Sequence, residues 1–286
     1  MTPPSTLARQ ALRAALATRA ELKLDRVTPV CPFDAADRLG VEVKFRAETS
    51  MEGMYCRSSK PTILVSTHRS SGRRSLTCAH ELGHHVFGHG TSVDEVLDED
   101  VWNGVTSPEE RSANLFASFF LMPKPVVEAA FKTRLLVPGN LTACDIYRVA
   151  CFLGVSYAGL IYHLQLSLDA TSATQTKAFL RIEPKQLKAQ LADDQTTGTV
   201  WPVDVHWIGR PVDVEQGDLI AAPNGTGHEG TTLAVKREND RAVYFAATKP
   251  GIARLSRGDW NVFVRVQRAG FIGRSIFRHL EDSDAD

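Results

Sequence analysis

The residues of this chain best suited to chemistry lie at positions 80–84, in the order His80-Glu81-Leu82-Gly83-His84. On an α-helix, residues four positions apart lie one turn apart on the same face. Two imidazoles at that spacing can bind one Zn²⁺ at about 2.0–2.1 Å. Glu81 projects about 100° around the helix axis from His80 and can act as a general base without taking a ligand position. The pattern is typical of zinc peptidases.

Two histidines one turn apart also occur on solvated helix faces, so the surroundings of the motif matter. Gly83 permits another element to approach the helix closely, at a cost of about 1 kcal/mol in helix propensity. Gly88 is a natural helix end. The residues that flank the histidines are small or apolar, which favours metal binding over a structural pair: Leu76, Ala79, Leu82, Val86.

A catalytic zinc usually has three protein ligands and keeps one position for water. A third histidine in the extended motif is excluded, because Phe87 stands where glycine is required and Gly90 where histidine is required. His89 lies one residue before the position that the extended motif requires for its third histidine. We therefore expect His89 and His85 at the surface or behind the ligands. The other option is a glutamate from the next helix, either Glu109 or Glu110. Periodicity does not choose between them, and Ser107-x-x-Glu110 also fits a capping box.

The chain of 286 residues is long enough for two modest domains. Its formal net charge of zero gives no support to a general polyanion-binding role. Its five cysteines are widely spaced without a Cys-x-x-Cys pair, which indicates reduced thiols in a cytoplasmic protein. Cys78 is interpreted as a small apolar residue of a helix core. No apolar run reaches the length of a membrane span, so no membrane partner is expected.

The elements that must position the motif lie on both sides of it in the chain. Apolar periodicity predicts helices near 7–24 and 34–39, and a helix from Ser107 to Leu121 after the motif helix. Strand-like runs at 41–47, 51–57 and 62–67 predict a small antiparallel sheet, with 62–67 as an edge strand that holds an extended peptide. The polar stretch 91–106 is expected to be a solvated loop.

The part of the chain after the Ser107–Leu121 helix predicts a different architecture. Two helices around a tight turn, 143–152 and 156–164, resemble a helix-turn-helix. Because the pair carries no basic cluster, packing is favoured over DNA contact, and direct DNA binding stays open as an alternative. The stretch 169–176 resembles a linker. Runs at 200–208, 219–222, 232–237, 242–247 and 261–268 predict strands.

The sequence therefore predicts an α+β protein. A zinc metallopeptidase domain with a helical core and a small antiparallel sheet occupies residues 1–138. A helix-turn-helix-like segment follows at 139–169, and a β-rich C-terminal domain at 170–286.

Two segments resemble the ImmA/IrrE family of zinc metallopeptidases: Leu76-Thr77-Cys78-Ala79-His80-Glu81-Leu82-Gly83-His84, and the helix that runs from Glu110-Arg111-Ser112-Ala113-Asn114 to Leu121-Met122-Pro123. The resemblance covers roughly residues 30–165. It implies His80, His84 and Glu110 as zinc ligands and Glu81 as the base. Leu76, Cys78 and Thr67 depart from the residues usual in the family, and none of these changes touches the metal or the base.

The same resemblance implies a function, and it implies a sensory or regulatory role for the β-rich region 170–286. Family members are typically bacterial or phage proteins that cleave a partner helix-turn-helix repressor and so switch on a stress or mobile-element response. The expected cofactor is Zn²⁺, with Mn²⁺ as a substitute, and the expected partner is a protein substrate. Two alternatives stay open: a DNA-binding regulator with a non-catalytic zinc site, and a module that sequesters the repressor without cutting it. The candidates for stabilising the oxyanion are His85, His89, Tyr55 and Tyr147.

Overall fold

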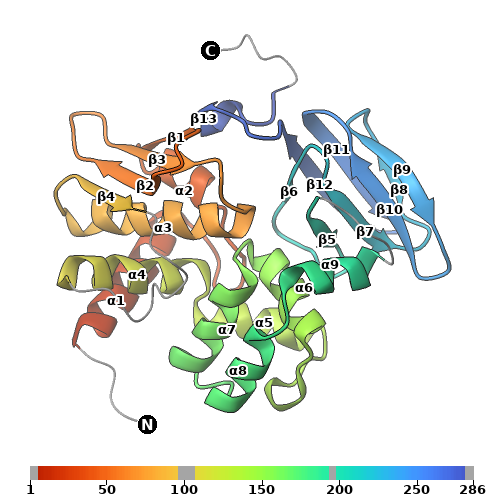
Figure 1. Cartoon of the computed structure of the whole chain (residues 1–286), viewed down its shortest axis with the longest axis horizontal. Coiled ribbons are helices and arrows are strands. Elements are labelled where there is room, and N and C mark those ends of the chain that lie inside the picture. Colours follow the sequence, from red (N-terminus) through yellow and green to blue (C-terminus); the bar gives the residue numbers. More distant parts are fainter. Residues whose placement is uncertain (1–5, 96–106, 193–197, 281–286) are drawn as a thin grey trace. The chain divides into compact units, whose positions relative to one another are not determined.

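The computed structural model describes residues 6–95, 107–192 and 198–280 of the chain (Figure 1). The described residues form an α+β fold, which confirms the predicted class. The chain divides into two compact units. Unit 1 contains residues 1–126 and 272–276, and unit 2 contains residues 127–271 and 277–286. The predicted domains divide the chain differently, and their boundaries stay a prediction.

The described helices of unit 1 lie where the apolar periodicity places them. They are α1 (Thr6–Glu21), α2 (Pro32–Arg38), α3 (Ser71–Phe87) and α4 (Pro108–Leu121). Helix α3 ends at Gly88, whose φ of 70° is in the left-handed region that favours glycine. Helix α4 begins after Ser107, whose hydroxyl accepts a hydrogen bond from the backbone N–H of Glu110. Both helix boundaries confirm the sequence-based expectation.

The sheet of unit 1 differs from the predicted antiparallel sheet. Within the described ranges, its strand order is β13-β1-β3-β2-β4. Strand β3 is antiparallel to β2 but parallel to β1, because it returns between the two strands that precede it. The sheet is therefore mixed, and the antiparallel prediction is wrong. The strands are β1 (Glu42–Arg46), β2 (Met51–Cys56), β3 (Thr62–Ser66), β4 (Ser92–Glu95) and β13 (Gly273–Arg274).

The edge of this sheet also corrects two expectations. Strand β3 is interior, so it does not offer the free edge predicted at 62–67. The edge next to β2 is β4, which pairs antiparallel with β2 and lies in the segment 91–106 predicted as a loop. Residues 96–106 of that segment lie outside the described residues. The segment is polar, so its composition predicts a loop. A short strand at the edge of a sheet can nevertheless be polar, because it pairs with a neighbouring strand on one side only.

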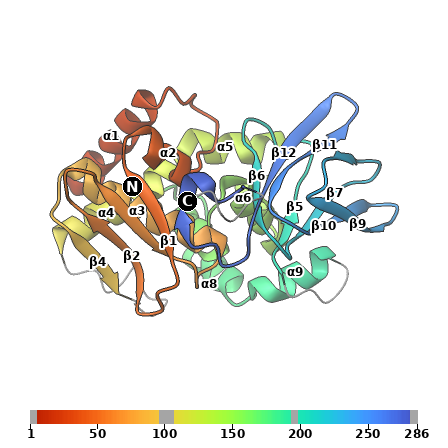
Figure 2. The same ribbon diagram turned by 90° about the horizontal axis from the view of Figure 1, so that it is seen from above.

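Helix α3 packs between the sheet and helix α4, as Figure 1 shows, and Figure 2 gives the same elements seen from above. Strands β1 and β3 bury Phe45, Ile63 and Val65 on the sheet side of this core. At the helix contact, a Cβ atom built on Gly83 would lie 3.0 Å from the Cα atom of Ala113. The α4 face toward this core is fully buried, with a small–large alternation at helical spacing: Ala113, Phe116, Ala117, Phe120.

Unit 2 begins within helix α5 (Lys124–Thr133) and contains the predicted helix pair. Helices α6 (Ala143–Leu153) and α7 (Tyr157–Leu166) meet at 101° around Gly154, which has a φ of 71°. The linker predicted at 169–176 is wrong, because Ser172 and Gln175 form a capping box that starts helix α8. The Ser/Thr-rich composition reflects this helix start. The other described helical elements are η1 (Pro138–Asn140), α8 (Ala173–Leu180), α9 (Pro184–Ala192) and η2 (Ser275–Phe277) at the junction of the two units.

The β-rich prediction for the C-terminal region is confirmed. In the part of the chain that the structure describes, unit 2 has two four-stranded sheets, ordered β5-β7-β10-β9 and β6-β12-β11-β8. The predicted strand at 200–208 ends at Pro202. Strand β11 escaped prediction because its inward positions include only small residues at Gly251 and Ala253 beside Leu255. The strands are β5 (Val200–Pro202), β6 (Val212–Glu215), β7 (Leu219–Pro223), β8 (Gly227–Glu229), β9 (Leu233–Glu238), β10 (Ala242–Ala247), β11 (Gly251–Arg257) and β12 (Trp260–Gln267).

Within the described residues, none of the single helices combines the length and apolar character that crossing a bilayer requires. Helices α6 and α7 reach that length and apolar character only together, and they are bent by 101°.

The packing of α3 on α4 predicts the effect of a larger residue at position 83. We expect Gly83→Val to lower the free energy of unfolding by about 1–3 kcal/mol, because the new side chain meets the α4 backbone. Gly90→Val is the matched control, since a Cβ atom there meets nothing within 4 Å. Urea denaturation of both variants measures the difference. Equal stability of the two variants would contradict the close helix contact.

Candidate metal centre

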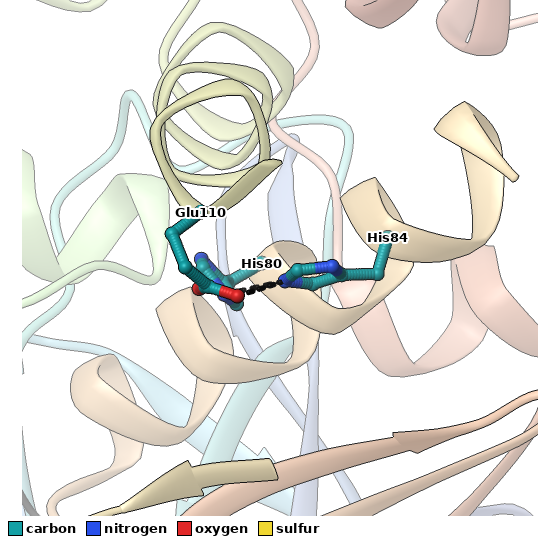
Figure 3. A group of neighbouring side chains, drawn as sticks. All are labelled: His80, His84 and Glu110. Atoms are coloured by element: carbon teal, nitrogen blue, oxygen red, sulfur yellow. Dashed lines mark hydrogen bonds and ion pairs between the residues drawn. The ribbon is translucent and has the colours of Figure 1, made fainter. Parts of the chain in front are cut away.

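Helices α3 and α4 bring three metal-ligand side chains together (Figure 3). The Nε2 atoms of His80 and His84 lie 3.0 Å apart. The carboxylate oxygens of Glu110 lie 3.1 Å from Nε2 of His80 and 3.4 Å from Nε2 of His84. All three ligand atoms lie within 4.8 Å of one another. The predicted set of His80, His84 and Glu110 is thus brought to one point from two elements.

The structure distinguishes between the two glutamates that open α4. Ser107 caps the helix by accepting the backbone N–H of Glu110 at 3.1 Å. The side chain of Glu110 points to the histidines, as Figure 3 shows, while Glu109 is exposed. One residue therefore contributes its backbone to the cap and its carboxylate to the histidine pair.

The charge and burial of this group fit a divalent cation. His80 and His84 are 5 % and 1 % exposed, and Glu110 is half-buried. The adjacent imidazoles of His80 and His84 hold the pKa of Glu110 well below its usual range, so the carboxylate is ionised at neutral pH. Two imidazoles and one carboxylate form a donor set that Zn²⁺ and related divalent metals bind. The residues present therefore fit such an ion.

The second ring nitrogens of both histidines are also engaged. Nδ1 of His80 lies 2.9 Å from Oδ1 of Asn114, and Nδ1 of His84 lies 3.0 Å from Nδ1 of His89. His89 thus lies behind a candidate ligand, as expected. The contact between Asn114 and His80 is not among the predictions from the sequence. A signal was present, because Asn114 follows Glu110 by one helical turn and shares its face.

The predicted base, Glu81, lies on the sheet side of α3. It is fully buried, and its Oε2 accepts a hydrogen bond of 3.2 Å from the hydroxyl of Ser92 on strand β4. Strand β2 passes so close at Gly53 that a Cβ atom there would lie 2.7 Å from Oε1 of Glu81 and 2.4 Å from Cγ2 of Thr77. The sequence does not indicate this contact of Ser92, because the polar segment that contains it predicts a loop.

The remaining candidates for chemistry have contacts of their own. The hydroxyl of Tyr55 lies 2.9 Å from Nδ1 of His85, and burial raises the pKa of Tyr55. The hydroxyl of Tyr147 donates to the carbonyl of Val200 within unit 2. We therefore assign none of these three residues to the reaction. Cys78 is fully buried and forms no disulfide, in agreement with its interpretation as a core residue.

The approach of β2 to α3 predicts that position 53 tolerates only glycine. We expect Gly53→Ala to lower the free energy of unfolding by about 1–3 kcal/mol, because the methyl group overlaps Thr77 and the Glu81 carboxylate. Thermal unfolding measures the loss. Gly139→Ala, where a Cβ atom meets nothing within 4 Å, is the control. If Gly53→Ala unfolds like the control, strand β2 does not confine Glu81.

Comparison with known proteins agrees with this geometry. A family model described as the IrrE N-terminal-like domain, of peptidase family M78, matches residues 36–164. No curated protein matches the chain. The matched range begins in α2, contains β1 to β4 with α3 and α4, and ends in α7. Because this family consists of metallopeptidases, the match implies a divalent metal and confirms the resemblance seen in the sequence. Residues 36–164 therefore match an IrrE N-terminal-like domain, in agreement with the resemblance of this part of the chain to the ImmA/IrrE family of metallopeptidases.

Proposed function

We propose that this protein is a zinc-dependent endopeptidase that hydrolyses a peptide bond in a partner protein. The observation that supports this function is the meeting of His80, His84 and Glu110 at one point, with Glu81 on the same helix. Three ligands leave one coordination position open, which distinguishes a catalytic site from a closed structural one. The family match supports the same conclusion.

The proposed mechanism assigns separate roles to the two glutamates. When bound, Zn²⁺ supplies a Lewis acid that polarises the scissile carbonyl and favours ionisation of water. His80, His84 and Glu110 would hold this ion, and Glu110 would add a negative charge to the donor set. Glu81 accepts the proton of the attacking water and delivers it to the leaving amine. The hydrogen bond from Ser92 and the close approach of Gly53 hold the Glu81 carboxylate in place during both transfers.

The proposed substrate is a helix-turn-helix repressor, whose cleavage would derepress a stress or mobile-element response in the cytoplasm. This proposal rests on the family match and on the zero net charge of the chain, which gives no support to nucleic acid as the general target. The β-rich region of unit 2 is proposed to regulate the peptidase.

Direct DNA binding is not favoured by the helix that would have to make the contact. Helix α7 contains no Lys or Arg, and its apolar side chains are largely buried. Its one histidine, His163, is 0 % exposed. A recognition helix requires exposed donors that reach phosphates and base edges.

Removing the base tests the mechanism. We expect Glu81→Gln to lower the rate of substrate cleavage by about 10²–10⁴-fold, because the amide cannot accept the proton. The zinc content, measured by elemental analysis, should equal that of the wild type. Glu109→Gln is the matched control and should keep full activity, since Glu109 is exposed and Glu110 is the proposed ligand. Full activity of Glu81→Gln would refute the assignment of the base.

Removing the metal tests the reaction class. We expect a chelator to abolish fragmentation of the repressor encoded beside this gene, and added Zn²⁺ or Mn²⁺ to restore it. Gel electrophoresis and mass spectrometry of the repressor give the readout. If the repressor binds tightly but stays intact with either metal, the protein sequesters its partner and is not a peptidase toward it.

A further inference from the structure

Each histidine of the metal centre has its Nδ1 atom turned toward a side chain outside the ligand set. We propose that Asn114 and His89 are positioning residues that fix the tautomers of His80 and His84, with the proton on Nδ1 and the lone pair of Nε2 facing the metal. This inference rests on the proposed metal centre and concerns residues that are not ligands themselves.

The contact of Asn114 determines where His80 carries its proton. The carboxamide oxygen of Asn114 lies 2.9 Å from Nδ1 of His80 and can only accept a hydrogen bond. Nδ1 must therefore donate, and a neutral imidazole protonated at Nδ1 has its lone pair on Nε2. Nε2 is the atom that lies 3.1 Å from Glu110. Helix α4 thus supplies one ligand, Glu110, and one turn later the residue that orients another.

The contact of His89 is less usual, because both partners are imidazoles. The two Nδ1 atoms lie 3.0 Å apart, so one of them must carry the proton that the other accepts. If Nε2 of His84 binds the metal, Nδ1 of His84 is the donor. His89 then accepts through Nδ1 and carries its own proton on Nε2. Ligand histidines commonly donate in this way to a carboxylate or a carbonyl, and here a neutral imidazole takes that role.

The end of helix α3 places His89 over His84. Gly88 turns the chain through a left-handed conformation, after which the backbone N–H of His89 donates to the carbonyl of His84 at 3.0 Å. The His89 ring stacks on Phe87 with centroids 5.5 Å apart and meets the His84 ring edge-on at 5.0 Å. The acceptor is therefore held by the helix cap and by contacts with two rings.

Metal affinity tests the role of Asn114. We expect Asn114→Ala to weaken zinc binding by about 10–100-fold in competition with a chromophoric chelator. Asn114→Asp keeps an acceptor and should restore the affinity. Leu115→Ala, on the same helix, is the control and should bind zinc like the wild type. In a His80→Ala background, Asn114→Ala should have no further effect, because the histidine that it orients is gone.

The tautomer of His89 gives a readout that is independent of activity. In the zinc-loaded protein, ¹⁵N-resolved spectra of the imidazole rings should show the proton on Nδ1 of His84 and on Nε2 of His89. His89→Asn keeps an acceptor near the position of Nδ1, whereas His89→Phe keeps only the ring, so His89→Phe should bind zinc more weakly than His89→Asn. The absorption spectrum of the Co²⁺-loaded protein should change with His89→Phe, since the imidazole of His84 is then free to rotate.

Three results would overturn the inference. If the wild type binds one zinc ion while Asn114→Ala and His89→Phe both bind it equally well, or if the proton lies on Nδ1 of His89, the positioning role is wrong and the metal centre stands. If the wild type binds no zinc, the metal centre itself fails and the positioning role fails with it.

Discussion

The close approach of helices α3 and α4 is the constraint on which the site depends. The candidate ligands come from two helices, so their meeting requires backbones that nearly touch. Gly83 and Ala113 provide this contact, where a Cβ atom on Gly83 would lie 3.0 Å from the Cα atom of Ala113. Gly83 lies between the two histidines of α3, and Ala113 follows Glu110 on α4. The contact that packs the helices therefore also sets the separation of the ligands.

Buried charge sets a second constraint. A carboxylate between two buried imidazoles is costly to desolvate unless a cation compensates it, and the neighbouring imidazoles lower the pKa of Glu110. Glu81 has a different environment, next to Gly53 and Ser92 of the sheet and about 100° around the α3 axis from His80. The cluster of metal-ligand atoms contains Glu110 and not Glu81, which agrees with one role as a ligand and another as a base.

Much of this arrangement is predictable from the sequence, because its causes are local. The spacing of His80 and His84, the helix end at Gly88 and the cap at Ser107 depend on neighbouring residues, and the structure confirms them. The choice between Glu109 and Glu110 is not local, since the capping box explains Glu110 equally well without a metal. Only the packing of α4 on α3 shows which carboxylate faces the histidines. The contact of His89 with His84 likewise depends on the left-handed turn at Gly88.

The sheet shows where local patterns fail. Strand β3 inserts between β1 and β2, and β13 joins the edge of β1 from the far end of the chain. Alternation within a strand carries no information about either pairing, so an antiparallel order was the simplest prediction and was wrong. Strand β4 was hidden by its polar composition. These strands matter for the site, since β2 and β4 contact the proposed base.

The most direct test of the central claim is to titrate zinc into the wild type and into Glu110→Ala and to measure the binding by isothermal titration calorimetry. A centre built from both helices predicts one ion per chain in the wild type. It also predicts a loss of affinity in Glu110→Ala larger than the roughly 10–100-fold typical of contacts outside the ligand set. Unchanged affinity in Glu110→Ala, or no ion in the wild type, would contradict the account.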